Sequence, residues 1–114
     1  MKISFDFDST LSTKRVQDLA AKFISLGADV YVTTSRPSSV KKGMAINNND
    51  LFDVTNALGI CKSKVRFTHY KDKYTFLKDF DLHFDDDDYE IQLINQHPSK
   101  CYGVLINPNN NLSL

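Results

Sequence analysis

The sequence has little of several features that would point to other classes of protein. Its 14 basic and 14 acidic residues give a formal net charge of zero, which argues against a general nucleic-acid or membrane binder and leaves a local basic patch open. Cys61 and Cys101 stand alone, without the paired spacing of a zinc site. We expect no signal peptide, and the sequence has no apolar run long enough to cross a bilayer. We therefore expect a cytoplasmic protein with two reduced thiols and no membrane partner.

We also expect no second domain, and the sequence shows no internal repeat. A chain of 114 residues suits one domain with a real core, and its hydrophobic and charged fractions are ordinary for a globular protein. We expect residues 1–106 to form the domain. The Asn-rich residues 107–114 are expected to form a surface tail.

What the sequence does contain is an alternation of strand and helix patterns. Hydrophobic alternation or β-branched runs predict strands, and a 3.6-residue period predicts helices. The first predicted strand begins at residue 3, and the other four cover 30–34, 64–68, 82–84 and 102–106. Helices are expected over 16–24, 51–58 and 71–78, and from residue 88. The first strand, helix and second strand form a βαβ unit, which implies parallel pairing. The fold class that follows is a single Rossmann-like α/β domain, with a five-stranded parallel sheet flanked by helices.

Polar side chains gather where these predicted strands end. They are Asp6 and Asp8 after the first strand, Thr34 after the second, Asp85 and Asp86 after the fourth, and Lys71 or Lys73 in the helix before the fourth. If the first strand stays extended to Asp8, its two carboxylates lie side by side. The carboxyl ends of strands in such a sheet meet at one crevice. Carboxylates with a hydroxyl and an ammonium there suit Mg²⁺ and a substrate phosphate.

Each of these residues also has an ordinary structural interpretation. The Asp6–Asp8 segment could be a turn that leads into the next helix, and Thr34 could be a strand residue with a satisfied hydroxyl. A lysine that begins a helix is usually solvated. We prefer Lys73 to Lys71, because it stands 12 residues before Asp85 and opens the helix.

The same residues carry a resemblance to a known family. Residues 6–10 (Asp-Phe-Asp-Ser-Thr), residues 34–36 (Thr-Ser-Arg), Lys73 and the Asp85–Asp86 pair resemble the four motifs of the haloacid dehalogenase (HAD) superfamily, in the family's order. The resemblance extends from residue 3 to about residue 106. Each motif is weak alone, and their specificity comes from the four occurring together.

This resemblance implies a role for each matching residue. Asp6 would be the nucleophile and a metal ligand, and Asp8 the general acid/base, with its backbone carbonyl on the metal. Thr34 would bind the transferring phosphoryl group, and Lys73 would neutralise developing charge. Asp85 and Asp86 would complete the Mg²⁺ site, and which of them is the direct ligand is left open.

The resemblance further implies a capless Mg²⁺-dependent phosphomonoester phosphatase. Dehalogenases of the superfamily lack an acid at the position of Asp8, and the connections after the first two strands leave no room for a cap domain. An open site would admit a macromolecular substrate such as a phosphoprotein or a nucleic-acid end. Candidate substrate contacts follow the second strand, at Ser35, Arg36, Lys41 and Lys42. The alternatives are a receiver-like phosphate-accepting module, whose acceptor would end its third strand, and a catalytically silent HAD-like scaffold.

Overall fold

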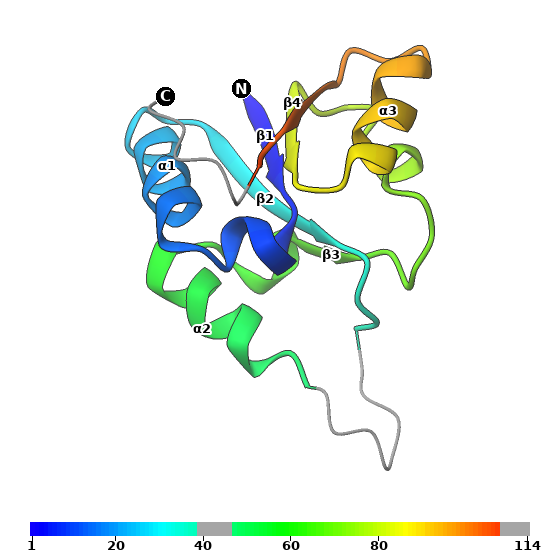
Figure 1. Cartoon of the computed structure of the whole chain (residues 1–114). Helices are drawn as coiled ribbons and strands as arrows, with labels where there is room; N and C mark the ends of the chain where they lie inside the picture. The colour runs from blue at the N-terminus through cyan, green and yellow to red at the C-terminus, as the bar shows by residue number, and fades with distance from the viewer. Residues whose placement is uncertain (39–46, 108–114) are drawn as a thin grey trace.

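Five parallel strands form one sheet at the centre of the computed structural model, which describes residues 1–38 and 47–107 (Figure 1). The strand order is β3-β2-β1-β4-β5. The strands are β1 (Lys2–Phe5), β2 (Asp29–Thr34), β3 (Val65–Phe67), β4 (Leu82–Asp85) and β5 (Tyr102–Leu105). The predicted fold class is confirmed. Lys41 and Lys42 lie outside the described residues.

Helices α1 (Lys14–Ser25) and α2 (Asn49–Leu58) cover one face of this sheet. Alternate residues of the central strands face them, because successive side chains of a strand point to opposite faces. Ile3 and Phe5 of β1 are fully buried there, and the Phe5 ring stacks on Phe84 of β4 at a centroid distance of 4.9 Å. At the end of α2, Gly59 takes a left-handed conformation with φ of 76°, which glycine adopts without steric cost.

Helix α3 (Asp88–Gln96) and the short 3₁₀ turn η3 (Lys73–Phe76) cover the opposite face. Leu77 and Phe80 follow η3 and pack with Ile91 and Ile94 of α3. The helix predicted over 71–78 is therefore reduced to one 3₁₀ turn. None of the helices within the described residues is long and apolar enough to span a membrane.

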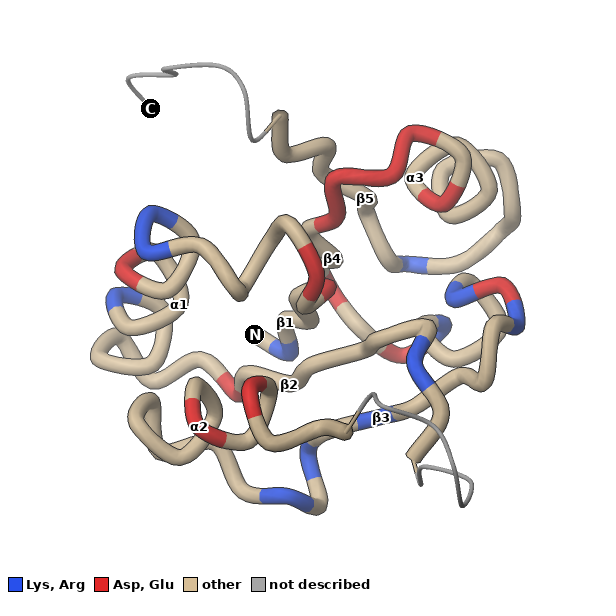
Figure 2. The backbone as a smooth tube through the Cα atoms, turned by 60° about the horizontal axis from the view of Figure 1, so that its bottom comes forward, with Lys and Arg blue, Asp and Glu red and all other residues tan. Residues whose placement is uncertain are grey.

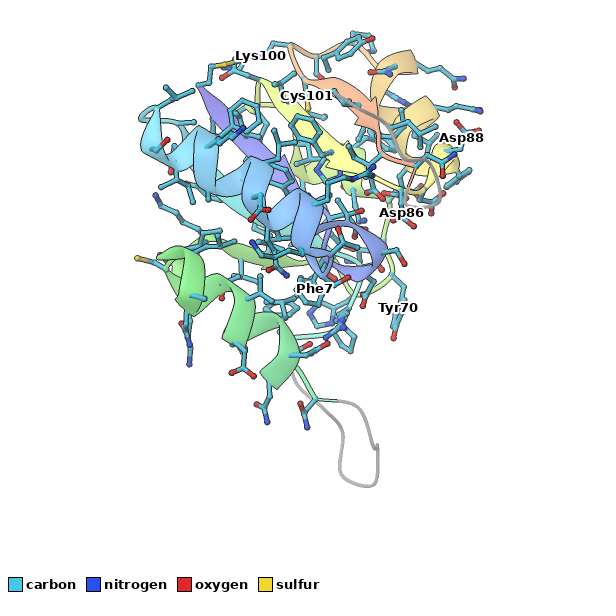
Figure 3. The ribbon with its side chains drawn as sticks, turned by 60° about the vertical axis from the view of Figure 1, so that its left-hand side comes forward. Phe7, Tyr70, Asp86, Asp88, Lys100 and Cys101 are labelled. Carbon is cyan, nitrogen blue, oxygen red and sulfur yellow. The ribbon has the colours of Figure 1, made fainter. Side chains whose placement is uncertain are left out.

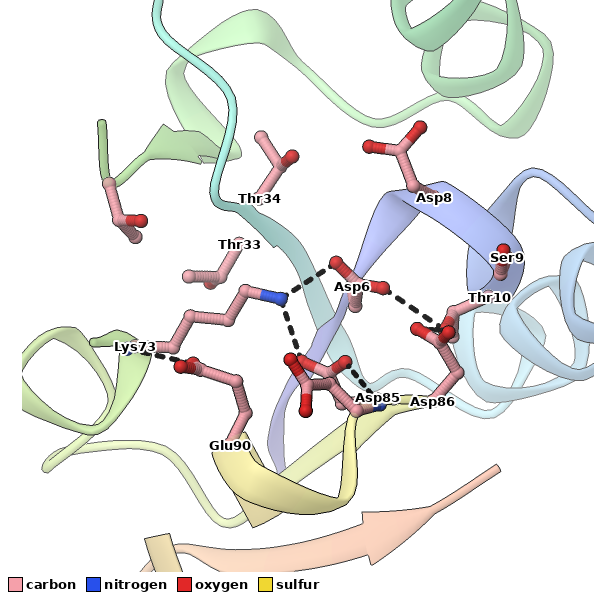
Figure 4. Close-up of polar contacts among 12 residues, drawn as sticks. Asp6, Asp8, Ser9, Thr10, Thr33, Thr34, Lys73, Asp85, Asp86 and Glu90 are labelled. Atoms are coloured by element: carbon pink, nitrogen blue, oxygen red, sulfur yellow. Dashed lines mark hydrogen bonds and ion pairs between the residues drawn. The ribbon is translucent and has the colours of Figure 1, made fainter. Parts of the chain in front are cut away.

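The chain turns sharply after β1. The strand ends at Phe5, and residues Phe7–Leu11 form an irregular turn (η1) in which Ser9 has a left-handed φ of 59°. The backbone N–H of Leu11 donates to the carbonyl of Asp6 at 3.0 Å and closes this turn. The side-by-side carboxylates expected of an extended segment are not found, because Asp6 points into the protein while Asp8 lies on the outer side of the turn (Figure 4).

Candidate functional site

Three carboxylates meet at the carboxyl ends of the two central strands. Asp6 follows β1, Asp85 is the last residue of β4, and Asp86 comes next. One oxygen from each lies within 4.8 Å of the others. β1 and β4 are neighbours at the point where the strand order reverses, which is where ligands bind in open α/β sheets. Figure 3 shows Asp86 and Phe7 away from Lys100 and Cys101, which precede β5.

Lys73 joins two of these carboxylates. Its Nζ donates to Asp6 Oδ1 and to Asp85 Oδ2, each at 2.7 Å, and its side chain is only 4% exposed. Glu90 of α3 accepts the backbone N–H of Lys73 at 2.9 Å and so fixes the start of η3. Lys71 is exposed, so the structure brings Lys73 and not Lys71 to the acidic cluster.

Two carboxyl groups of this cluster, Asp6 and Asp85, have pKa values shifted in opposite directions. Burial, followed by the charge of Asp85, raises the pKa of Asp6 to about 8. Burial alone would also raise the pKa of Asp85, but the hydrogen bond from His83 and the charge of Lys73 outweigh it and lower that pKa to about 2. Asp85 is therefore the carboxylate that stays ionised beside Lys73. Figure 2 shows how acidic residues 85–88 follow one another between β4 and α3.

Three residues without a predicted role also belong to the site. The Thr10 hydroxyl lies 3.2 Å from both Asp6 Oδ2 and Asp86 Oδ1 (Figure 4). Glu90 anchors Lys73, and His83 contacts Asp85 at 2.8 Å. Thr10 lies within the first motif, residues 6–10, so the sequence could have indicated that it belongs to the site. His83 stands two residues before Asp85 in β4, so strand alternation puts both side chains on one face. Glu90 reaches the site only through the tertiary fold.

Asp8 and Arg36 form a separate group at the rim. Arg36 donates to both oxygens of Asp8, from Nε at 3.0 Å and from one terminal nitrogen at 2.6 Å. Its remaining N–H groups donate to Asp50 and Asn48 at the start of α2. The guanidinium also lies 5.0 Å from the centre of the Phe7 ring. All five N–H groups of Arg36 are thus engaged within the protein, and none is free for the substrate contact predicted from the sequence.

The two remaining residues predicted at the end of the second strand differ in their exposure. Thr34 is fully buried, and its hydroxyl accepts the backbone N–H of Arg36 at 3.2 Å. Ser35 instead lines a cavity of about 260 Å³. The cavity is also lined by Asp6, Asp8, Ser9, Lys73, Asp85, Asp86 and Asp87. Of the predicted site residues, Ser35 is thus the hydroxyl that reaches the cavity, while Thr34 lies behind its wall.

The fold and this cluster define a class of protein. The chain is a Rossmann-like α/β protein whose three clustered carboxylates could hold a metal ion. Oxygen ligands alone suit a hard cation rather than a soft one. Neither protein-family models nor curated proteins give a match to this chain.

Proposed function

We propose that this protein is a member of the HAD superfamily and a Mg²⁺-dependent phosphomonoester phosphatase, which works through an aspartyl-phosphate on Asp6. One observation carries the proposal: the ammonium of Lys73 joins Asp6 and Asp85 beside Asp86, in a cavity at the strand ends. A carboxylate nucleophile, a fixed ammonium and an oxygen-only cation site are the groups that phosphoryl transfer requires.

The donor set fits Mg²⁺, because Mg²⁺ binds through one or two carboxylates together with water and substrate oxygens. Asp6, Asp85 and Asp86 would hold the ion with their side chains, and Asp8 with its backbone carbonyl. The bound cation supplies the charge that lets an anionic phosphate approach an anionic nucleophile. Such a positive charge is needed because, among the described residues, five aspartates and one lysine line the cavity.

Asp6 begins the reaction. One of its oxygens attacks phosphorus, the bond from phosphorus to the leaving oxygen breaks, and that oxygen takes a proton from Asp8. Water then attacks the phosphorus of the aspartyl-phosphate, Asp8 takes its proton, and Asp6 and inorganic phosphate are released. Lys73 has three N–H groups and donates two of them to carboxylates, so the third can bind a phosphate oxygen.

Asp8 has to move for this chemistry. Both of its oxygens accept hydrogen bonds from Arg36, yet its side chain is 57% exposed and it lines the cavity. The Arg36 side chain is 15% exposed and its contact with Asp8 is bidentate, so this pair is stronger than an ordinary surface ion pair. Breaking this pair has a free-energy cost, which substrate binding has to offset when Asp8 turns to the leaving oxygen.

A receiver-like module is the competing function, since receivers also combine aspartates, a hydroxyl and a lysine at Mg²⁺. Two observations count against it. The strand order here is β3-β2-β1-β4-β5, whereas receivers have the order 2-1-3-4-5. The three residues of β3, Val65–Phe67, include no aspartate to accept phosphate.

The experiment is a screen of phosphorylated metabolites, nucleotides, phosphopeptides and end-phosphorylated oligonucleotides, with Mg²⁺ and with a chelator. We expect Mg²⁺-dependent release of inorganic phosphate over many turnovers. A receiver would take up at most one phosphate per molecule. No turnover with any compound would contradict the proposal.

A further inference from the structure

A row of buried polar side chains runs beneath the site, on the face of the sheet that α3 and η3 cover. His83 of β4 and Ser4 of β1 are neighbours in register, and both are fully buried. His83 Nδ1 lies 3.0 Å from the Ser4 hydroxyl, which lies 2.7 Å from the hydroxyl of Thr33. At the other end of the row, His83 Nε2 lies 2.8 Å from Asp85 Oδ2. A polar row in a sheet interior is costly unless each member has a partner.

The partners of His83 determine which of its nitrogens carries the proton. An ionised carboxylate can only accept hydrogen bonds, so the proton of His83 lies on Nε2 and is donated to Asp85. Nδ1 lies 3.0 Å from the hydroxyl of Ser4, which in turn donates to Thr33.

Counting lone pairs shows what His83 does to Asp85. A carboxylate offers about four acceptor positions on its two oxygens. Oδ2 accepts from both His83 Nε2 and Lys73 Nζ, and Oδ1 accepts the backbone N–H of Asp87 at 3.0 Å. Three positions are therefore filled, from β4, from η3 and from the turn before α3. One position remains, on Oδ1.

We propose that His83 is a positioning residue for Asp85: its Nε2–H fixes the plane of the carboxylate so that the last acceptor position of Oδ1 is kept for a divalent cation. This inference rests on the proposed Mg²⁺ site. His83 itself touches neither the cation nor the substrate. Hydrogen-bond partners of metal ligands commonly set metal affinity by about 10–100-fold.

The experiment measures Mg²⁺ affinity by calorimetry in the full chain, so that it does not depend on catalysis. His83→Leu removes the donor at similar volume, whereas His83→Gln keeps an amide N–H that can reach Asp85. Thr33→Val is the matched control, because it replaces a buried polar group of the same row that does not contact Asp85. A thermal melt without metal establishes that each variant is folded.

We expect His83→Leu to weaken Mg²⁺ binding by about 10–100-fold, and His83→Gln to restore most of the affinity. Thr33→Val should bind as the wild type does. Wild-type affinity in a folded His83→Leu protein overturns the inference and leaves the proposed function standing. If His83→Leu does not fold, His83→Gln decides: affinity near that of the wild type supports the inference, and a loss as large as that of Asp85→Ala overturns it. A wild type that binds no Mg²⁺ overturns both proposals.

Discussion

At the scale of single residues, charge is most crowded at Asp6. It is 5% exposed, lies beside Asp85 and Asp86, and has its pKa raised to about 8 by burial and by the charge of Asp85. An acid whose pKa is higher in the folded than in the unfolded protein costs stability as the pH rises between the two values. For Asp6 this window runs from 3.8 to about 8.

We therefore predict that metal-free wild type loses thermal stability as the pH rises through this window. Asp6→Asn should lose the pH dependence contributed by Asp6, because an amide does not titrate, and its melting temperature at the upper end of the window should exceed that of the wild type. Melts monitored by circular dichroism at a series of pH values test this. Parallel curves for the two proteins would show that Asp6 does not carry the effect.

The second residue-scale prediction concerns Asp8. If Asp8 protonates the leaving oxygen, Asp8→Asn should slow cleavage of an alkyl phosphate by about 10²–10⁴-fold. The loss should be much smaller with nitrophenyl phosphate, whose leaving group hardly needs a proton. Single-turnover assays of the first step separate the two substrates, and equal losses on both would argue against the acid role.

Which individual residues reach the site was only partly predictable from the sequence. Chain order predicted that Asp6, Asp85 and Lys73 would lie together, as they do, because the carboxyl ends of parallel strands meet at one edge of the sheet. The pairing of Asp8 with Arg36 was not predictable. It depends on the turn after β1 and on Asp50, whose oxygens hold the other side of the guanidinium.

At the scale of elements, the position of Lys73 depends on how α3 holds η3. Glu90 is buried and accepts the backbone N–H of Lys73 across 17 residues. No local pattern could have revealed this contact, which is why the sequence predicted a longer helix over 71–78. The strands, in contrast, follow directly from hydrophobic alternation, and each was predicted to within a few residues.

We predict that Glu90→Ala lowers the free energy of unfolding by about 1–3 kcal/mol, because it leaves a buried N–H without an acceptor. Phosphatase activity should fall as well, because Lys73 loses its anchor. Glu90→Gln is the control, since its amide oxygen can accept the same hydrogen bond and should retain most of both properties. Chemical denaturation and steady-state assays measure the two effects, and equal behaviour of the Ala and Gln variants would contradict this account of Lys73.

At the scale of the whole molecule, the acidic cluster makes stability depend on metal. An ion that binds only the folded form stabilises it by about 2.7 kcal/mol when its concentration is a hundred times Kd. We predict an upward shift of the melting temperature with Mg²⁺ in the wild type and a much smaller shift in Asp85→Ala. Asp88→Ala, at the exposed start of α3, should respond as the wild type does. The same shift in all three proteins would exclude Asp85 as a ligand.

Substrate size is also a property of the whole molecule. Residues 6–13, most of them in the short turn Phe7–Leu11, separate β1 from α1, and no second domain among the described residues covers the cavity. Binding energy must then come from parts of the substrate outside the cavity. We predict that a phosphorylated protein or nucleic-acid end has a higher kcat/KM than its minimal phosphate fragment.

Replacing Lys41 and Lys42 together by Ala should weaken the large substrate and spare the fragment. These lysines lie outside the described residues, and only their place after the second strand suggests the role. A preference for small metabolites by a strictly monomeric protein would refute the open-site prediction.

The overall architecture was the part most accessible from sequence. Alternating strand and helix patterns leave few ways to build a parallel sheet, and the observed order β3-β2-β1-β4-β5 is one of them. The buried row through Ser4, His83 and Thr33 was not accessible, because it joins three strands in a register that only the folded sheet defines.

The central claim is that Asp6 carries the phosphoryl group, and trapping that group is its most direct test. The protein would be mixed with Mg²⁺ and the best phosphorylated substrate of the screen, quenched in acid within one turnover, digested and analysed by mass spectrometry. The account predicts a phosphate on the peptide that contains Asp6, which hydroxylamine removes and which is absent from Asp6→Asn. Turnover without any such phosphopeptide, or turnover by pure Asp6→Asn, would contradict it.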